Sequence, residues 1–336
     1  MKKICLIILA GFIMNSVSTS QSFNGEPMTH TFSIVARDSA TGEMGVAVQS
    51  HWFSVGSVVS WAEAGVGAIA TQSLVNVSFG PRGLALLKEG KSAQEALEEL
   101  LASDDGSEFR QVAIVDSQGN VAVHTGDKCI EEAGHIKGKN FSVQANMMLN
   151  DTVWKEMSDA FKNSPGSLAE KMIAAFKAAQ KAGGDIRGQQ SASLLLVKGK
   201  STGKPWEDVV IDLRVEDDPD AVAEIARLLK VHKAYEHMNA GDLAIEENNV
   251  DKALKEYGAA EEMFPENTEM KFWTAVSLAN VDRIEESIPL FKKVFEENVN
   301  WKTLTKRIVK NGMLQVNEKN LQKILSAAET KTGKEK

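Results

Sequence analysis

The chain has 336 residues, 43% of them hydrophobic and 25% charged, a length that exceeds one ordinary hydrophobic core and predicts two folded domains. The same composition excludes a chain that is mostly disordered. The formal net charge of −8, with lysines interleaved among glutamates, argues against binding to nucleic acid or anionic lipid, because both require clustered Lys and Arg.

Residues 1–20 have the pattern of a secretory signal peptide. Met1-Lys2-Lys3 supplies a positive start, and the apolar run over 5–14 is too short to span a bilayer. Small residues then place the cut ahead of Thr19 or Gln21; a buried N-terminal helix is the alternative interpretation. We therefore expect export to the periplasm or the extracellular medium, with no membrane attachment after cleavage. Cleavage leaves one cysteine, Cys129, so no intrachain disulfide is expected.

A mixed pattern of strands and helices runs from residue 31 to residue 215. Predicted strands cover 31–38, 43–49, 55–61, 65–71, 111–116, 120–125, 141–147, 190–198 and 209–215. Predicted helices start within 84–87 and at 92, 151 and 167, where Ser92 opens a capping box and Asp151 and Ser167 are the expected N-caps. Strands and helices come in groups and do not alternate singly, so we predict an α+β fold of two packed sheets with helices outside.

A charged break at 217–220 separates this region, assigned to 29–216, from a helical region assigned to 220–330. The helical region repeats at a spacing of 34 residues, with Tyr257 matching Phe291 and Ala260 matching Val294. That spacing is typical of tetratricopeptide repeats, whose stacked helix pairs bind proteins. A generic helical bundle is the alternative.

Common enzyme motifs for phosphate, zinc or dinucleotide binding are missing from the sequence. His51, His124 and His135 have no diagnostic metal-ligand spacing, so we expect no metal and no cofactor. Thr31 begins the first predicted strand. A threonine at a free chain end can act as a nucleophile, because its own α-amine can take the proton of its hydroxyl.

Several blocks of the first region resemble a bacterial and archaeal family known only as a domain of unknown function, number ten-twenty-eight. The matching blocks are residues 31–38, 45–50, 64–72, 80–83, 110–113, 124–126, 129, 133–135 and 183–192. The most specific is Gly183-Gly184-Asp185-Ile186-Arg187-Gly188-Gln189-Gln190. The resemblance covers about 31–215 and implies the four-layer αββα sandwich of the N-terminal-nucleophile (Ntn) hydrolase superfamily, with an amidohydrolase activity on a small amide or peptide-like substrate.

The resemblance also implies roles for individual residues. Catalytic positions are assigned to Thr31 as nucleophile, Asn146 as the side-chain donor of an oxyanion hole, Asp185 and Arg187; substrate-binding positions are assigned to Gln72, His124, His135 and Gln190. Asp185 and Arg187 could instead pair and order their glycine-rich loop.

Catalysis by Thr31 requires a further cut. After signal removal, residues 21–30 would still precede Thr31, so its amine is free only if the chain is also cut between His30 and Thr31, by itself or by another enzyme. Without this cut the chain would be a non-catalytic binding protein on an enzyme fold. In either case we expect the repeats to bind an unidentified protein partner or to join subunits into a homo-oligomer.

Overall fold

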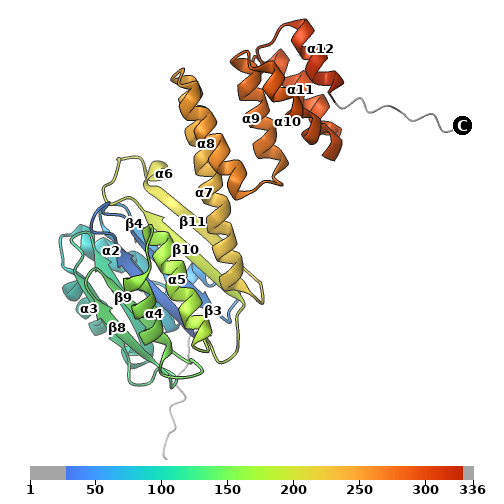
Figure 1. The fold of residues 1–336 in the computed structure, drawn as a ribbon. Coiled ribbons are helices and arrows are strands. Elements are labelled where there is room, and N and C mark those ends of the chain that lie inside the picture. Colours follow the sequence, from blue (N-terminus) through green and yellow to red (C-terminus); the bar gives the residue numbers. More distant parts are fainter. Residues whose placement is uncertain (1–27, 328–336) are drawn as a thin grey trace, which may run out of the picture.

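The computed structural model describes residues 28–327, so the predicted signal peptide lies outside the described part. Within this part, a sandwich of strands and helices is followed by a column of helices (Figure 1). The predicted fold class, α+β followed by all-α, is confirmed. No helix within 28–327 is long and apolar enough to cross a membrane.

The first sheet has five antiparallel strands. In spatial order they are β1 (Met28–Thr29), β5 (Gly67–Leu74), β6 (Arg110–Asp116) and β7 (Val121–Thr125), with β4 (Ser60–Glu63) also paired to β5. Both β4 and β1 use the edge of β5 that β6 leaves free: β4 pairs with its first half and β1 with its end.

The second sheet has six antiparallel strands with the predicted hairpin at its centre. Their spatial order is β11 (Val209–Val215), β10 (Ser191–Val197), β3 (Met44–Ser50), β2 (Thr31–Arg37), β9 (Phe141–Ala145) and β8 (Gly134–Gly138). Strand β2 pairs with β3 along its whole length, so Thr31 lies opposite Ser50 at one end. Residues of β2 and β3 are almost all buried because each face of the sheet is covered.

Helices cover the outer face of each sheet and complete four layers. Helices α2 (Phe79–Lys88) and α3 (Ala93–Ala102) pack on the first sheet, and α4 (Val153–Asn163) and α5 (Leu168–Lys181) pack on the second. Short valine and alanine side chains fill the space between the sheets. The predicted capping box of Ser92 with Glu95 is present, and the predicted N-cap Ser167 also forms a capping box, with Glu170.

Some predicted elements are wrong. The valine-rich segment 55–61 is not one strand: α1 (Gly56–Val59) precedes β4, and this turn buries Val55 and Val59 on one face. Helix α2 begins at Phe79, ahead of the predicted start, because a proline in the first turn removes an N–H that has no intrahelical acceptor. Asp151 is not the N-cap of α4, which follows Thr152 without a side-chain cap. Strand β8 was not predicted at all, because Gly134–Gly138 is poor in β-branched residues.

Helix α7 (Ala221–Glu246) belongs to both parts of the molecule. Its first half packs on the sandwich through Val222, Ile225 and Leu229. Its second half packs against α8 (Val250–Met263) through Ala234 and Met238. The charged segment 217–220 therefore precedes a helix that continues without interruption from the sandwich into the repeats (Figure 1).

The remaining helices of the C-terminal region are tetratricopeptide-like. They are α9 (Thr268–Asn280), α10 (Ile284–Glu297), α11 (Asn300–Lys310) and α12 (Glu318–Ser326). Two short elements, α6 (Pro205–Asp208) and the 3-10 helix η1 (Ser107–Phe109), belong to the sandwich instead. Helices α8 and α10 have the same length and start 34 residues apart. The matched residues Tyr257 and Phe291 are both fully buried, so the sequence period corresponds to equivalent packing positions.

Candidate functional site

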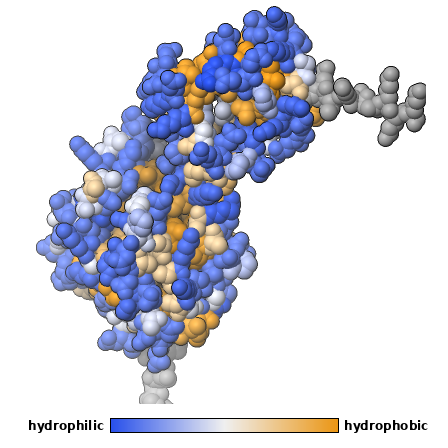
Figure 2. Space-filling view, in the orientation of Figure 1, coloured by the Kyte–Doolittle hydropathy of each residue, from blue (hydrophilic) through white to orange (hydrophobic). Residues whose placement is uncertain are grey.

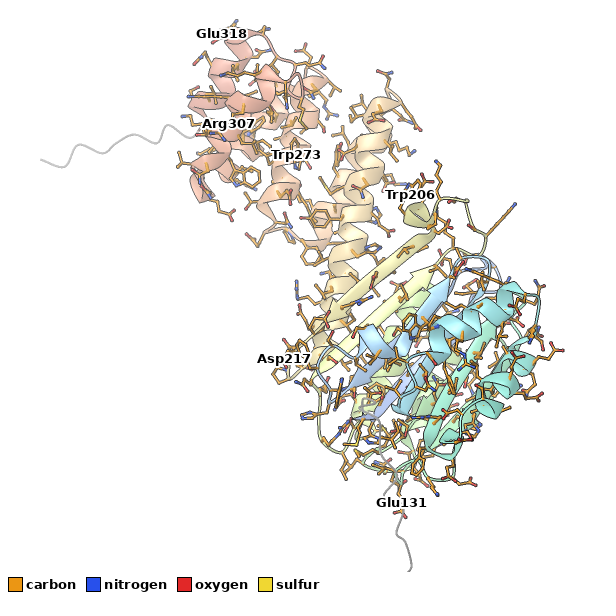
Figure 3. The ribbon with its side chains drawn as sticks, turned by 180° about the vertical axis from the view of Figure 1, so that it is seen from behind. Glu131, Trp206, Asp217, Trp273, Arg307 and Glu318 are labelled. Carbon is orange, nitrogen blue, oxygen red and sulfur yellow. The ribbon has the colours of Figure 1, made fainter. Side chains whose placement is uncertain are left out.

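The space between the two sheets is apolar at one end and polar at the other. The polar end contains buried side chains from β2, β3, β5, β6 and β9, namely Thr31, Ser33, Ser50, Gln72, Gln111 and Gln144. Figure 3 shows Glu131 at this end of the sandwich and Trp206 at the opposite end. The loop that carries Glu131 is hydrogen-bonded to the residues just after Asn146.

These buried side chains form one hydrogen-bonded network across the sheets. Gln144 donates to Ser33 (2.6 Å), whose hydroxyl donates to the Gln72 side-chain oxygen (2.6 Å). Gln72 and Asn146 both donate to the Gln111 side-chain oxygen, at 2.6 and 2.9 Å. The network holds its members in one arrangement, because breaking one bond leaves a buried polar group unpaired. The Gln144 side-chain oxygen alone among these amide oxygens has no partner within the described residues.

Thr31 is fully buried at the edge of this network. Its hydroxyl donates to the Thr29 carbonyl oxygen (2.5 Å). Its own carbonyl oxygen accepts from the Asn146 backbone N–H (3.1 Å) and the Gln72 amide (3.3 Å). The network therefore fixes the backbone of the candidate nucleophile, while residues 28–30 cover it.

The carbonyl oxygen of His30, which belongs to the peptide bond before Thr31, accepts two hydrogen bonds. The Ser50 hydroxyl donates at 2.6 Å and the Arg187 guanidinium at 2.8 Å. Ser50 reaches this atom because β3 places it opposite Thr31. Two donors, one of them charged, withdraw electron density from this carbonyl and stabilise negative charge on its oxygen.

Asp185 holds Arg187 in place. Its buried carboxylate accepts from Arg187 Nε (3.0 Å) and Nη2 (2.7 Å), and also from the backbone N–H groups of Arg187 and His51. The ion pair expected as the alternative role of these residues is thus present, and it also aims the guanidinium at the His30 carbonyl.

The His30 ring is buried beside Asn146. Its Nδ1 lies 2.9 Å from Asn146 Oδ1, and because the Asn146 amide nitrogen donates to Gln111, this oxygen accepts from the ring. Burial lowers the pKa of His30 below its ordinary 6.5, and the positive charge of Arg187 lowers it further. His30 is therefore neutral at pH 7 and donates from Nδ1.

Five of the predicted site residues, Thr31, Gln72, Asn146, Asp185 and Arg187, meet around the His30–Thr31 peptide. His135 is linked to them indirectly: its Nδ1 lies 2.8 Å from the Thr125 hydroxyl, which accepts from Gln111 (2.8 Å).

The other two predicted residues lie elsewhere. His124 contacts the Ser107 carbonyl oxygen (3.0 Å), and the side chain of Gln190 donates to Asp217 (3.0 Å) at the surface. Asn146 directs its amide to Gln111 and the Thr31 carbonyl, so in the uncut chain it does not serve the His30 carbonyl. Burial raises the pKa of the Cys129 thiol, which disfavours a reactive thiolate there.

Sequence reasoning missed four polar residues of the network and one donor to the His30 carbonyl. They are His30, Ser33, Gln111, Gln144 and Ser50. One signal was available: each of the last four is a polar residue in a largely buried strand, at a position that alternation aims at the opposite sheet.

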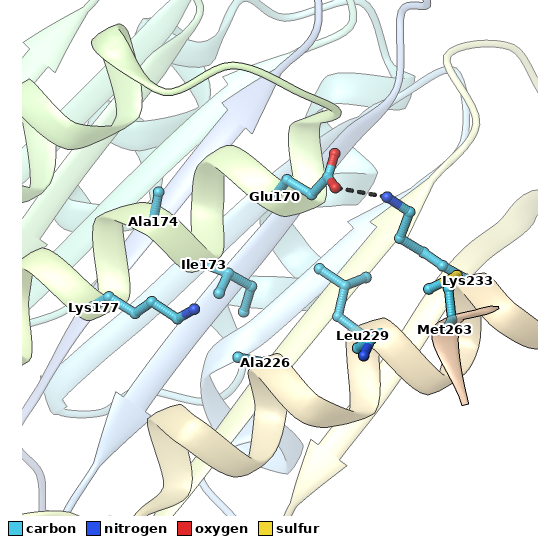
Figure 4. A pocket seen from close by; sticks show the side chains of 9 residues that line it. Glu170, Ile173, Ala174, Lys177, Ala226, Leu229, Lys233 and Met263 are labelled. Atoms are coloured by element: carbon cyan, nitrogen blue, oxygen red, sulfur yellow. Dashed lines mark hydrogen bonds and ion pairs between the residues drawn. The ribbon is translucent and has the colours of Figure 1, made fainter. Parts of the chain in front are cut away.

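A separate groove of about 430 Å³ lies between α5 and α7. Hydrophobic side chains reach the surface there (Figure 2), and Figure 4 shows Ile173 and Leu229 on its floor with the Glu170–Lys233 ion pair (2.6 Å) at its rim. None of the residues around Thr31 lines it. Within 28–327, no group of three or more His, Cys, Asp or Glu residues is placed to hold a metal ion.

The fold is a four-layer αββα sandwich, as the family resemblance implies, and a threonine begins one of its central strands. The chain belongs to the family of unknown function DUF1028, whose model matches residues 31–225. The match begins at Thr31 and ends within the first half of α7.

The solved structures that are similar to this chain include the following two. Protein SPO2555 from Silicibacter pomeroyi, described with the same family, is 28% identical with a TM-score of 0.55, over 60% of this chain and 85% of that one. Anbu (ancestral beta-subunit) from Yersinia bercovieri is 13% identical over 59% of this chain and 92% of that one, with a TM-score of 0.29, which is too low to support an inference. None of the curated proteins matches the sequence significantly.

Proposed function

We propose that this protein is an exported Ntn amidohydrolase that acts on a small amide or peptide-like substrate, with Thr31 as nucleophile and no cofactor. One observation carries the proposal: the carbonyl of the peptide bond before Thr31 accepts hydrogen bonds from both Ser50 and Arg187. Such a carbonyl is prepared for attack by the adjacent hydroxyl, which would free the Thr31 amine.

The cleavage reaction needs water as its only other reactant. Thr31 Oγ1 attacks the His30 carbonyl carbon, and Ser50 and Arg187 stabilise the negative charge that develops on the carbonyl oxygen. The bond to the Thr31 nitrogen breaks, the hydroxyl proton ends on that nitrogen, and an ester joins His30 to Thr31 Oγ1. Water then hydrolyses the ester, which releases a His30 carboxylate and leaves Thr31 with a free amine and hydroxyl.

The same groups would serve substrate hydrolysis. The freed α-amine has an unperturbed pKa of about 7.7–8.0, so a large fraction is able to accept the hydroxyl proton near neutral pH. Ser50 and Arg187 would then donate to the carbonyl oxygen of a substrate amide. Asn146 would lose His30 as a partner and present its side-chain oxygen to the substrate.

The experiment is an intact-mass measurement on the full-length protein after secretion and folding. We expect an N-terminus at Thr31 in the parent and in Thr31→Ser, whose hydroxyl can also attack, and an uncut His30–Thr31 bond in Thr31→Ala. A parent that stays uncut after long incubation, or a Thr31→Ala variant that is cut equally well, would exclude self-cleavage by Thr31.

A non-catalytic binding protein is the second candidate, and the burial of Thr31 beneath residues 28–30 favours it. In that case the repeats would carry the function. They offer a groove of about 580 Å³ lined by residues that include Asp242, Glu246, Tyr257 and Trp273, where a protein partner or a second copy of the chain could bind. A permanently uncut parent whose partner binding is lost in Trp273→Ala would support this candidate.

Export rests on the sequence of residues 1–20 alone. The positive start and the apolar run support a cleaved signal peptide and a periplasmic or extracellular location. Separating the cellular fractions of an expressing bacterium tests this, and finding the whole protein in the cytoplasm with Met1 retained would refute it.

A further inference from the structure

The segment that covers Thr31 lies as a short strand along the end of β5. Met28 is opposite Leu74 and Thr29 is opposite Ser73, in antiparallel register. Because β4 occupies the first half of the same edge, β1 fills what would otherwise be an open strand position beside Thr31. The chain then crosses at His30 to the second sheet, where Thr31 begins β2.

The side chains of this segment are buried progressively toward the His30–Thr31 bond. Met28 is 52% exposed, whereas Thr29 and His30 are 0% and 4% exposed. The His30 ring meets Asn146 at 2.9 Å, but the buried Thr29 hydroxyl oxygen has no hydrogen-bond partner among the described residues. Two enclosed side-chain sites therefore precede the bond: one with a hydrogen-bond acceptor, and one that fits a small side chain without recognising its hydroxyl.

The receiving edge of β5 is held in place by groups other than β1. Arg110 donates to the Leu74 carbonyl oxygen (2.6 Å) and is itself fixed by the partly buried Asp104 (2.7 Å). Ser73 has φ of +74°, a left-handed conformation that is uncommon for a residue with a side chain and occurs where the surroundings impose it, often at functional sites. The edge would therefore keep its shape after residues 28–30 leave.

We propose that, once the His30–Thr31 bond is cut, this edge binds the acyl part of a peptide substrate as an added strand. The three substrate residues before the scissile bond take the places of Met28, Thr29 and His30. This inference rests on the proposed function and deepens it, because it selects an extended peptide over a single small amide. Main-chain hydrogen bonds supply the affinity in this mode of binding, and the enclosed sites supply the preference for side chains.

The geometry of the uncut chain defines the bound substrate. Its reactive carbonyl takes the place of the His30 carbonyl, between Ser50 and Arg187. The carbonyl one residue earlier takes the place of that of Thr29 and accepts from the Thr31 hydroxyl. The residue next to the scissile bond donates to Asn146 as the His30 ring does now.

The test uses the processed full-length protein and fluorogenic amides. The probes are acetyl-Met-Thr-His-aminomethylcoumarin, the same peptide N-methylated at Met and Thr, its Val-for-Thr analogue, and acetyl-His-aminomethylcoumarin. We expect kcat/KM for the tripeptide to exceed that of the single-residue probe by about tenfold or more, and N-methylation to abolish this gain, because one methylated nitrogen must face β5. The Val analogue should equal or exceed the parent probe.

Two further measurements separate the possible failures. Intact mass reports whether Thr31 is the N-terminus, and acylation by a small β-lactone, which needs no added strand, reports whether its hydroxyl is reactive. A processed, lactone-reactive protein that cleaves the N-methylated or single-residue probe as fast as the tripeptide would overturn the strand site and leave the proposed function standing. A protein that is never cut at Thr31 overturns both.

Discussion

The two donors to the His30 carbonyl should control how fast the chain is cut. Ser50→Ala removes the hydroxyl that lies 2.6 Å from the carbonyl oxygen. Arg187→Lys keeps the positive charge but cannot bind both Asp185 oxygens and still reach the His30 carbonyl as the guanidinium does. Removing one donor from a site where negative charge develops costs about 2.7–4 kcal/mol, or about 10²–10³ in rate.

The assay follows conversion of the uncut chain by intact mass over time, after refolding from denaturant. For Ser50→Ala we expect the full slowing of about 10²-fold or more. The Arg187 side chain is 28% exposed and already paired with Asp185, so screening should make the effect of Arg187→Lys smaller. Thr31→Ala gives the uncut baseline.

Matched controls separate this effect from loss of stability. Ser142→Ala removes another buried strand hydroxyl, one without a hydrogen-bond partner among the described residues. Arg214→Lys is the control for Arg187→Lys. Arg214 pairs with Asp212, two residues earlier, as Arg187 pairs with Asp185, but this pair lies on β11 at the surface. If Ser50→Ala and Arg187→Lys are cut as fast as these controls, polarisation of the His30 carbonyl does not speed the cleavage.

Three other predictions concern stability. Gln111→Leu removes the acceptor at 2.6 and 2.9 Å from the buried amides of Gln72 and Asn146, which keep only their longer contacts to the Thr31 carbonyl. It should lower the free energy of unfolding by about 3 kcal/mol in urea titrations. Gln94→Leu at the surface should change it by less than about 0.5 kcal/mol, and equal effects would contradict the network. Burial lowers the pKa of His30 and His135 below 6.5, so the unfolded chain binds more protons than the folded chain; the stability that the two neutral rings contribute is complete above pH 6.5 and is lost as the pH falls through the lower folded pKa. In the uncut Thr31→Ala chain, a His30→Gln change should therefore flatten the dependence of the free energy of unfolding on pH. An unchanged slope would contradict the prediction. Gly241→Ala places a methyl group 2.4 Å from the Tyr257 ring and should lower the stability of the repeats by about 1–3 kcal/mol in thermal melts. Gly258→Ala, whose new methyl group would have no atom within 4 Å, should raise their stability by about 0.5–1 kcal/mol. Changes of the same sign in both variants would contradict the packing.

Local patterns predicted much of the fold. The capping box at Ser92, the N-cap at Ser167 and the β2–β3 hairpin each depend on residues close in sequence, and the structure confirms them. The 34-residue period is confirmed by the matching starts of α8 and α10. Segment 55–61 failed because its valines satisfy both a strand and a short helix, and only tertiary burial of Val55 and Val59 decides between them.

The site was less accessible to sequence reasoning. Thr31 and the loop containing Asp185 and Arg187 came from family resemblance, but the meeting of Ser50, Arg187 and the His30 carbonyl joins atoms 20 and 157 residues apart. Strand register and the crossing of the chain between two sheets at His30 bring them together. Neither follows from local propensity.

Helix α7 determines how the repeats are oriented relative to the sandwich. One continuous helix leaves one part and enters the other, so its rotational phase sets which side of the repeat column faces the sandwich. One residue inserted between Leu229 and Ala234 would turn the column by about 100° and advance it by about 1.5 Å.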